Sequence, residues 1–236
     1  MLRRQFIIST LALGLAPAAF AQGYGRLSQG DARSGIRAAL DTAARLATDR
    51  LGRTDGFFGD PAVHIPLPRN IASLQTQLRR VGMSGPVDDL ELRINRSAEA
   101  AMPEAGRIFN DAVQSITVGD AVSIVRGGDT AATDYLRGRS ESRLTGLLRP
   151  SMEDALTGSG AYRAVDAVEP QISGGQNLLG SLFGNRSATG SLRDSVTDHA
   201  VSRTIDGVFH YIGQEERAIR QDPVRRGTDI LRRVFG

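Results

Sequence analysis

The chain has 236 residues, with 29 basic residues that are all arginine, 26 acidic residues and a formal net charge of +3. This near balance argues against a nucleic-acid-binding protein, which needs a clustered basic surface. Because the chain has no cysteine, it has no disulfide, no thiolate metal site and no lipid-anchoring cysteine.

Residues 1–21 have the parts of an export signal peptide. Arg3 and Arg4 precede a charge-free apolar stretch, and the small residues Ala19 and Ala21 stand where a signal peptidase would cut. The paired arginines favour the twin-arginine route, with an ordinary secretory signal as the alternative. We expect cleavage after Ala21 and a periplasmic location.

The remaining chain is predicted to be one helical domain over residues 35–236, preceded by a flexible mature N-terminus over residues 22–34. Apolar residues recur every three or four positions, which is the spacing of amphipathic helices. Helices are predicted over residues 31–51, 70–81, 87–116, 117–127, 129–136, 141–148, 151–156, 192–220 and 222–236.

Three local signals refine these helices. Pro103 lies inside the third helix and is expected to bend it. Thr117 and Asp120 form a capping box for the next helix, and Asp129 or Thr130 caps the one after it.

No segment after the signal approaches the roughly 18 to 20 apolar residues that a transmembrane helix needs.

Two segments break the helical spacing. Prolines alternate with apolar residues towards the end of residues 52–68, which predicts a structured loop or a short proline-rich extended ribbon, and we favour the ribbon. Residues 173–190 are rich in glycine and serine and are predicted to form a loop. The predicted fold class is therefore all-α, a multi-helix bundle with one ribbon.

The sequence shows no recognisable catalytic or metal-binding motif. His199 and His210 lie eleven residues apart on one predicted helix, about 16 Å along its axis, so they cannot bind one ion. No nucleophile elbow, paired-histidine zinc motif or complete dinucleotide fingerprint occurs. We expect no metal and no cofactor.

Two polar sets are the candidate ligand-binding residues. Glu91, Asn95 and Glu99 step by four along one helix and form a row beside Arg96. This row is either a network that fixes helix packing or the wall of a pocket for a small polar ligand. Glu216 and Arg220 form a second set, read either as an exposed ion pair or as part of a site.

Several short segments together resemble the bacterial domain-of-unknown-function family 4197 (DUF4197). They are Gly56-Phe57, Ile65-Pro66-Leu67-Pro68, Glu91-Leu92, Asn95-Arg96, Ala98-Glu99-Ala100-Ala101, Thr117, Asp120-Ala121, Gly127-Gly128-Asp129, Ala131-Ala132-Thr133, Tyr135, Asp206-Gly207, Phe209, Glu215-Glu216 and Ala218-Ile219-Arg220. The resemblance runs from about Gly35 to Gly236 and implies an exported, mainly helical protein without an assigned activity. Asp129 and Tyr135, within these segments, complete the candidate ligand-binding residues.

These observations favour a non-catalytic periplasmic binding or interaction module, whose partner is a small polar ligand or a periplasmic protein. One alternative is an enzyme that draws its groups from Glu91, Arg96, Glu99, Asp120 and Asp129. Another alternative is peripheral membrane association, because the C-terminal helix after Asp222 is basic and amphipathic.

Overall fold

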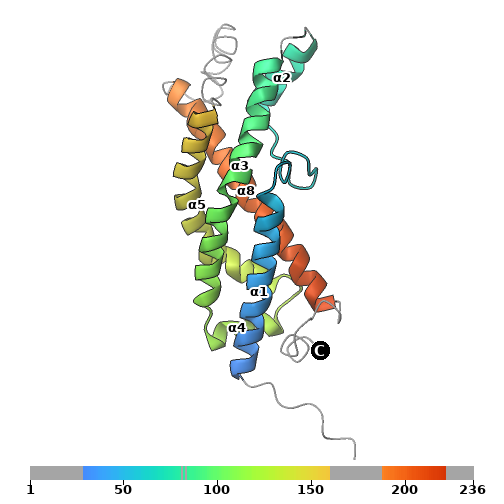
Figure 1. Ribbon diagram of the computed structural model, residues 1–236, viewed down its shortest axis with the longest axis vertical. Helices are drawn as coiled ribbons and strands as arrows, with labels where there is room; N and C mark the ends of the chain where they lie inside the picture. The colour runs from blue at the N-terminus through green and yellow to red at the C-terminus, as the bar shows by residue number, and fades with distance from the viewer. Residues whose placement is uncertain (1–28, 81, 83, 160–187, 222–236) are drawn as a thin grey trace, which may run out of the picture.

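The computed structural model describes residues 29–80, 82, 84–159 and 188–221. This part of the chain is an all-α bundle without a strand (Figure 1), as the apolar spacing predicts. Its helices are α1 (Gln29–Leu51), α2 (Arg69–Arg80), α3 (Gly85–Gln114), α4 (Val118–Arg126), α5 (Ala131–Ser159) and α8 (Ala188–Gln221).

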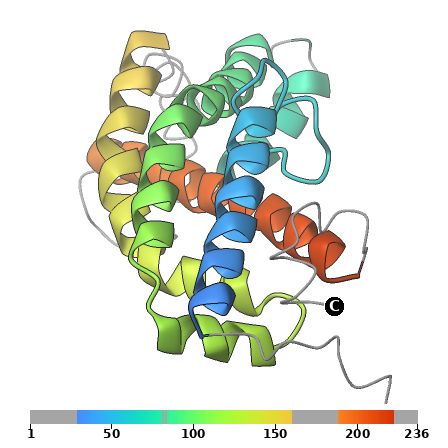
Figure 2. The ribbon, with the colours of Figure 1, turned by 60° about the horizontal axis from the view of Figure 1, so that its bottom comes forward.

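The bundle consists of a three-helix layer crossed by one long helix. Helices α1, α3 and α5 lie side by side with alternating direction, and α8 runs diagonally across one face of this layer (Figure 2). The core lies between the layer and α8, where the rings of Phe109 and Phe209 pack edge to face with centroids 5.5 Å apart. No helix in the described ranges is long and apolar enough to span a membrane.

Antiparallel contacts between α1 and α3 are fixed at the end of α3. Arg33 Nε and Arg37 Nη2 of α1 donate hydrogen bonds to the carbonyl of Ile116, at 2.8 and 3.0 Å. Arg37 also donates to the carbonyl of Gln114, the last residue of α3. The last carbonyls of a helix lack partners within the helix and carry partial negative charge, so this contact of Arg37 stabilises the end of α3. Helix α3 continues through Pro103, in agreement with the predicted single long helix.

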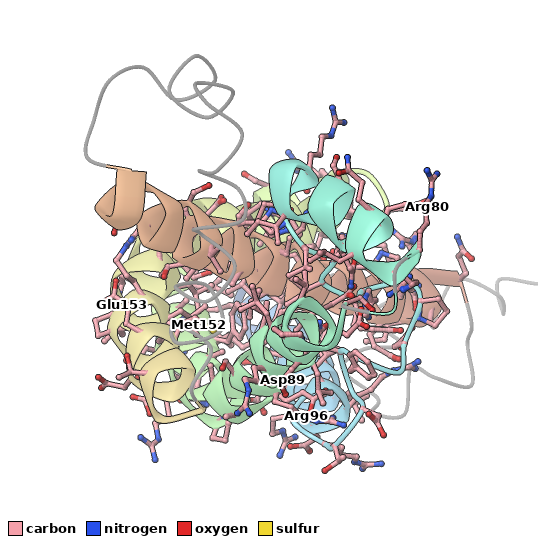
Figure 3. All side chains as sticks on the ribbon, turned by 90° about the horizontal axis from the view of Figure 1, so that it is seen from above. Arg80, Asp89, Arg96, Met152 and Glu153 are labelled. Carbon is pink, nitrogen blue, oxygen red and sulfur yellow. The ribbon has the colours of Figure 1, made fainter. Side chains whose placement is uncertain are left out.

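Helix α5 is longer than expected. Residues 129–136, 141–148 and 151–156 were predicted as separate helical pieces, but residues 131–159 form one helix with Pro150 inside it. Its buried side chains repeat every fourth residue, at Ala132, Leu136, Ser140, Leu144, Leu148 and Met152. In Figure 3, Met152 points into the bundle and Glu153 away from it. Pro150 removes only one helical donor, and the packed stripe compensates for that loss.

The predicted ribbon over residues 52–68 is not found. We call residues 52–68 the α1–α2 loop; it forms successive turns up to residue 63, and residues 64–68 belong to neither helix nor strand. The carbonyl of Asp60 accepts hydrogen bonds from Val63 N and His64 N, and Asp60 Oδ1 accepts one from Ala62 N. The Asp60-Pro61 turn therefore reverses the chain before it can extend.

The first residues of α1 and α8 differ from the predicted ones. Helix α1 begins at Gln29 and includes residues 29–34 of the predicted flexible start, and α8 begins at Ala188 within the predicted loop over residues 173–190. The rest of that loop, the signal peptide and the C-terminal helix after Asp222 lie outside the described residues.

Candidate functional site

The candidate residues fall into two clusters in the fold. Glu91, Asn95, Arg96 and Glu99 lie on α3 and contact the α1–α2 loop, whereas Glu216 and Arg220 of α8 contact the start of α5. The loop comes before α3 in the chain but packs against the side of its first half (Figure 1). The segments that carry the family resemblance therefore meet in space.

Glu99 binds two consecutive amides of the loop. Its Oε1 accepts hydrogen bonds from Phe57 N (3.1 Å) and Phe58 N (3.3 Å), and its Oε2 accepts one from Arg96 Nη1 (2.7 Å). Arg96 Nη2 also donates to Asp55 Oδ1 at 2.6 Å. The carboxylate is buried, so these donors replace the water that it loses.

Arg96 lies on the side of α3 that faces the loop (Figure 3). Hydrogen bonds from Arg96 to Glu99 and to Asp55 raise the pKa of the guanidinium. An arginine and two carboxylates thus converge, as the pocket hypothesis requires, but they bind one another and Glu99 also binds main-chain amides. This cluster behaves as the packing network that the sequence offered as its alternative.

The side chain of Asn95 makes two hydrogen bonds to the main chain of the loop, as a residue of a neighbouring strand would. Its Oδ1 accepts a hydrogen bond from Ile65 N and its Nδ2 donates to Ile65 O, both at 2.9 Å. The Asn95 side chain is fully buried, with 0% exposure. One amide side chain therefore satisfies both main-chain groups of a residue that lies outside any helix or strand.

Glu91, the first residue of the row, contacts the loop through His64. Its Oε1 lies 2.9 Å from His64 Nε2, and its Oε2 accepts a hydrogen bond from Gln75 Nε2 of α2 at 2.8 Å. The other ring nitrogen, His64 Nδ1, lies 3.0 Å from the carbonyl of Phe58. No pattern in the sequence predicts this contact of His64.

Helix α8 holds the other side of the loop. His199 Nε2 donates to the carbonyl of Pro66 at 2.7 Å, and the Tyr211 hydroxyl donates to the Asp60 carboxylate. Burial raises the pKa of Asp60, but hydrogen bonds from Tyr211, Ala62 N and Arg50 outweigh it and lower that pKa. Burial and the same hydrogen bond raise the pKa of Tyr211.

Glu216 forms the second cluster, at the start of α5. Its two oxygens accept hydrogen bonds from Ala132 N (2.9 Å) and Thr133 N (2.7 Å). Arg220 lies 2.8 Å from Glu216 Oε1 and also donates to the carbonyl of Ile124 at 3.1 Å. Both side chains are buried, so this is a core contact and not an exposed ion pair. Glu216 binds the first amides of α5, a role predicted for Asp129 or Thr130.

Asp120 and Tyr135 lie next to this second cluster. Asp120 forms the predicted capping box with Thr117 and also accepts a hydrogen bond from the Tyr135 hydroxyl at 2.8 Å. Hydrogen bonds from the Thr117 hydroxyl and amide, then from Tyr135, lower the pKa of Asp120. Burial, followed by the bond to Asp120, raises the pKa of Tyr135. Asp129 is exposed in the preceding turn and joins neither cluster.

Two hollows of the described surface are lined by none of Glu91, Asn95, Arg96, Glu99, Glu216 and Arg220. A groove of about 460 Å³ between α1 and α3 is lined by Asp41, Ala44, Arg45, Thr48, Asp49, Gly52, Arg53, Met102, Pro103, Gly106, Arg107 and Asn110. An open hollow of about 420 Å³ over the loop is lined by Arg50, Arg53, Thr54, Asp55, Gly56, Gly59, Asp60 and Pro61. Within the described ranges, no three acidic or histidine side chains are placed to hold a metal ion.

The loop exposes an aromatic side chain that sequence reasoning did not single out. Phe58 is 38% exposed although its amide is fixed by Glu99. Its ring lies 5.8 Å from the Arg96 guanidinium and 5.4 Å from the His64 ring. The buried contacts therefore hold an apolar surface residue in one defined position.

A protein-family model, described as "Protein of unknown function (DUF4197)", matches residues 26–236. No curated protein and no solved structure matches the chain.

Proposed function

The chain belongs to the DUF4197 family, and we propose that it is an exported, non-catalytic interaction module that binds a periplasmic protein through its α1–α2 loop. One observation carries this proposal: Glu91, Asn95 and Glu99 all bind the loop, which leaves Phe58 exposed on a fixed backbone. Binding residues are often carried by loops that a rigid scaffold positions, and aromatic anchors contribute much of the energy of many interfaces.

The same contacts argue against the enzyme alternative. A general base needs a free lone pair directed at a substrate, but Glu99 and Glu216 direct theirs at main-chain amides. Asp120 is occupied by Thr117 and Tyr135. Of the other members of the proposed pool, Glu91 contacts His64 and Gln75, and Arg96 binds Glu99 and Asp55. Asp129 is exposed.

Site-specific photo-crosslinking in the producing cell tests the binding surface. We expect benzoylphenylalanine in place of Phe58 to give a discrete adduct with a periplasmic protein. The matched control is the same replacement of Leu147, which is 44% exposed on α5. No discrete adduct at position 58, or the same adduct at both positions, would contradict the proposal. Native mass spectrometry of the purified protein tests the small-ligand alternative.

Export is the second part of the proposal, and it is supported by the composition of residues 1–21. We expect the mature protein to begin at Gln22 and to accumulate in the periplasm. Replacement of Arg3 and Arg4 by lysine should abolish export by the twin-arginine route, which fractionation and immunoblotting measure. Undiminished export would assign the signal to the ordinary secretory route instead.

A further inference from the structure

His64 lies between two groups that accept hydrogen bonds. Its Nδ1 lies 3.0 Å from the carbonyl oxygen of Phe58, and its Nε2 lies 2.9 Å from Glu91 Oε1. A carbonyl and an ionised carboxylate have no proton to donate, and a neutral imidazole has only one N–H. Both contacts are therefore hydrogen bonds only when the imidazole carries two protons.

We propose that His64 is a proton-dependent latch, whose imidazolium ties the Phe58 segment of the loop to α3 and thereby makes the exposed position of Phe58 depend on pH. Histidine is the side chain that ordinarily changes charge between about pH 5 and 8. The regulatory part of this inference rests on the proposed binding function of the loop, whereas the latch itself does not.

After the His64 imidazolium loses one proton, it can no longer donate hydrogen bonds from both ring nitrogens. A neutral ring can donate to Glu91 or to Phe58 O, and its other nitrogen then presents a lone pair to an acceptor. This repulsion removes the hydrogen bond on that side. Glu99 still holds the amides of Phe57 and Phe58, so the latch controls the carbonyl side of Phe58 and not the whole loop.

Several titratable or charged groups surround His64. Glu91 is the charged group in direct contact, and its second oxygen is held by Gln75, which also donates to Asp88. Other titratable or charged groups on the elements packed around this site include Arg79, Asp88, Arg96 and Glu99 on α2 and α3, Asp55 and Asp60 in the loop, Arg50 on α1, and His199 and Tyr211 on α8.

The two other histidines of the chain provide controls. His199 Nε2 faces the carbonyl of Pro66, a contact that a neutral imidazole makes with its single N–H. His210 Nε2 lies 2.7 Å from the Gln214 side-chain amide. Among the three histidines, all within the described ranges, His64 has acceptors at both ring nitrogens.

Nitrogen-15 NMR of the three imidazoles between about pH 5 and 8.5 tests the latch. We expect both His64 nitrogens to carry protons at the acidic end. On deprotonation, the amide signals of residues 58–64 should shift, and His64→Gln should abolish this response while replacement of the exposed His210 by glutamine preserves it. A His64 ring that stays neutral across this range in the wild-type protein would overturn the proposal without any variant. Equal shifts of the loop amides in His64→Gln would do the same.

Crosslinking from position 58 at pH 5.5 and pH 8 then tests the regulatory part. We expect the adduct yield to change by about twofold or more between the two conditions, and to be independent of pH in His64→Gln. If the NMR response is present but no adduct forms at either pH, the binding function fails and the latch stands. Equal yields in the wild-type protein would overturn the regulatory role alone.

Discussion

At the scale of single residues, the Asn95 side chain binds both the N–H and the C=O of Ile65, as a neighbouring strand does in a sheet. An asparagine side chain carries the same donor and acceptor as a peptide group, so it can pair with both sides of one residue. Polar residues that recur every four positions along a helix usually lie on its exposed face. Only the position of the loop over α3 shows why this one is buried.

Replacing Asn95 by leucine should leave the N–H and C=O of Ile65 buried without partners. Each orphaned group costs about 1 to 3 kcal/mol, so we expect the free energy of unfolding to fall by roughly 2 to 5 kcal/mol in urea titrations. The matched control is Asn110→Leu in the same helix, where the side chain is exposed and makes one 3.3 Å bond to Asp41. A loss of similar size in both variants would contradict the role of Asn95.

Glu216 and Glu99 share one arrangement. Each carboxylate accepts from two consecutive main-chain amides, and an arginine three or four residues away supports it. The sequence predicts the arginine pairs, because that spacing places both side chains on one helix face. It does not predict the amides, which come from residues far away in the chain.

Glu216→Gln should destabilise the protein by roughly 2 to 4 kcal/mol, because it leaves the buried Arg220 charge without its carboxylate. Glu104→Gln removes an exposed carboxylate, paired with Arg107 at 2.6 Å, and should change stability by less than about 1 kcal/mol. Thermal and urea unfolding of the two variants measure the difference. Equal effects would show that Glu216 contributes no more than an exposed pair.

At the scale of secondary-structure elements, α5 shows where sequence reasoning was wrong. Separate helical pieces were predicted, whereas residues 131–159 form one helix that contains Gly138, Gly146 and Pro150. The structure retains the helix because buried residues continue at four-residue steps on both sides of Pro150. Tertiary packing thus decides where a helix ends when local propensity is poor.

Close packing of α8 against the loop gives a test at the same scale. A Cβ at Gly207 would lie 2.8 Å from Phe57 Cε1 and 3.3 Å from Val63 Cβ. Phe57 is fully buried and cannot move aside, so Gly207→Ala should cost about 1 to 3 kcal/mol through overpacking.

The matched control is Gly138→Ala in α5, where an added Cβ meets no atom within 4 Å. We expect this substitution to stabilise the protein by about 0.5 to 1 kcal/mol, since alanine has the higher helix propensity. Both values are measurable by urea unfolding. Stabilisation by Gly207→Ala would contradict the close contact between α8 and the loop.

At the scale of the whole molecule, the periodicity of apolar residues was sufficient for the fold class and for most helix positions. It was not sufficient for the α1–α2 loop, where alternating prolines resemble an edge strand. The described part of the chain contains no strand for the loop to pair with, and side chains of α3 and α8 bind its main chain instead. The sequence therefore predicts the row of side chains on α3, but the partners of these side chains depend on contacts between distant segments.

Stability of the whole fold should fall in acid. The pKa values of Asp60, Asp88 and Asp120 lie below the ordinary value of 3.8; for Asp88 the largest cause is a hydrogen bond from Ser84. A carboxylate with a lowered folded-state pKa contributes fully above its unfolded value, and this contribution is lost as the pH falls through the folded value.

We therefore expect urea unfolding to show constant contributions from these carboxylates near pH 7 and a progressive loss below about pH 4. Asp120→Asn should be less stable at pH 7 but lose less on acidification than the wild-type protein, because its capping side chain no longer titrates. An equal loss in both proteins would contradict the role of Asp120.

The contact of Glu216 with α5 has a consequence for the order in which the chain can fold during its synthesis. The ribosome must add 83 residues after Thr133 before Glu216 exists. Until then, the first amides of α5 lack their acceptor, and the face of the layer that α8 covers stays open. The bundle is thus completed only when the C-terminal part of the chain has emerged, so nascent chains that stop before α8 expose the core.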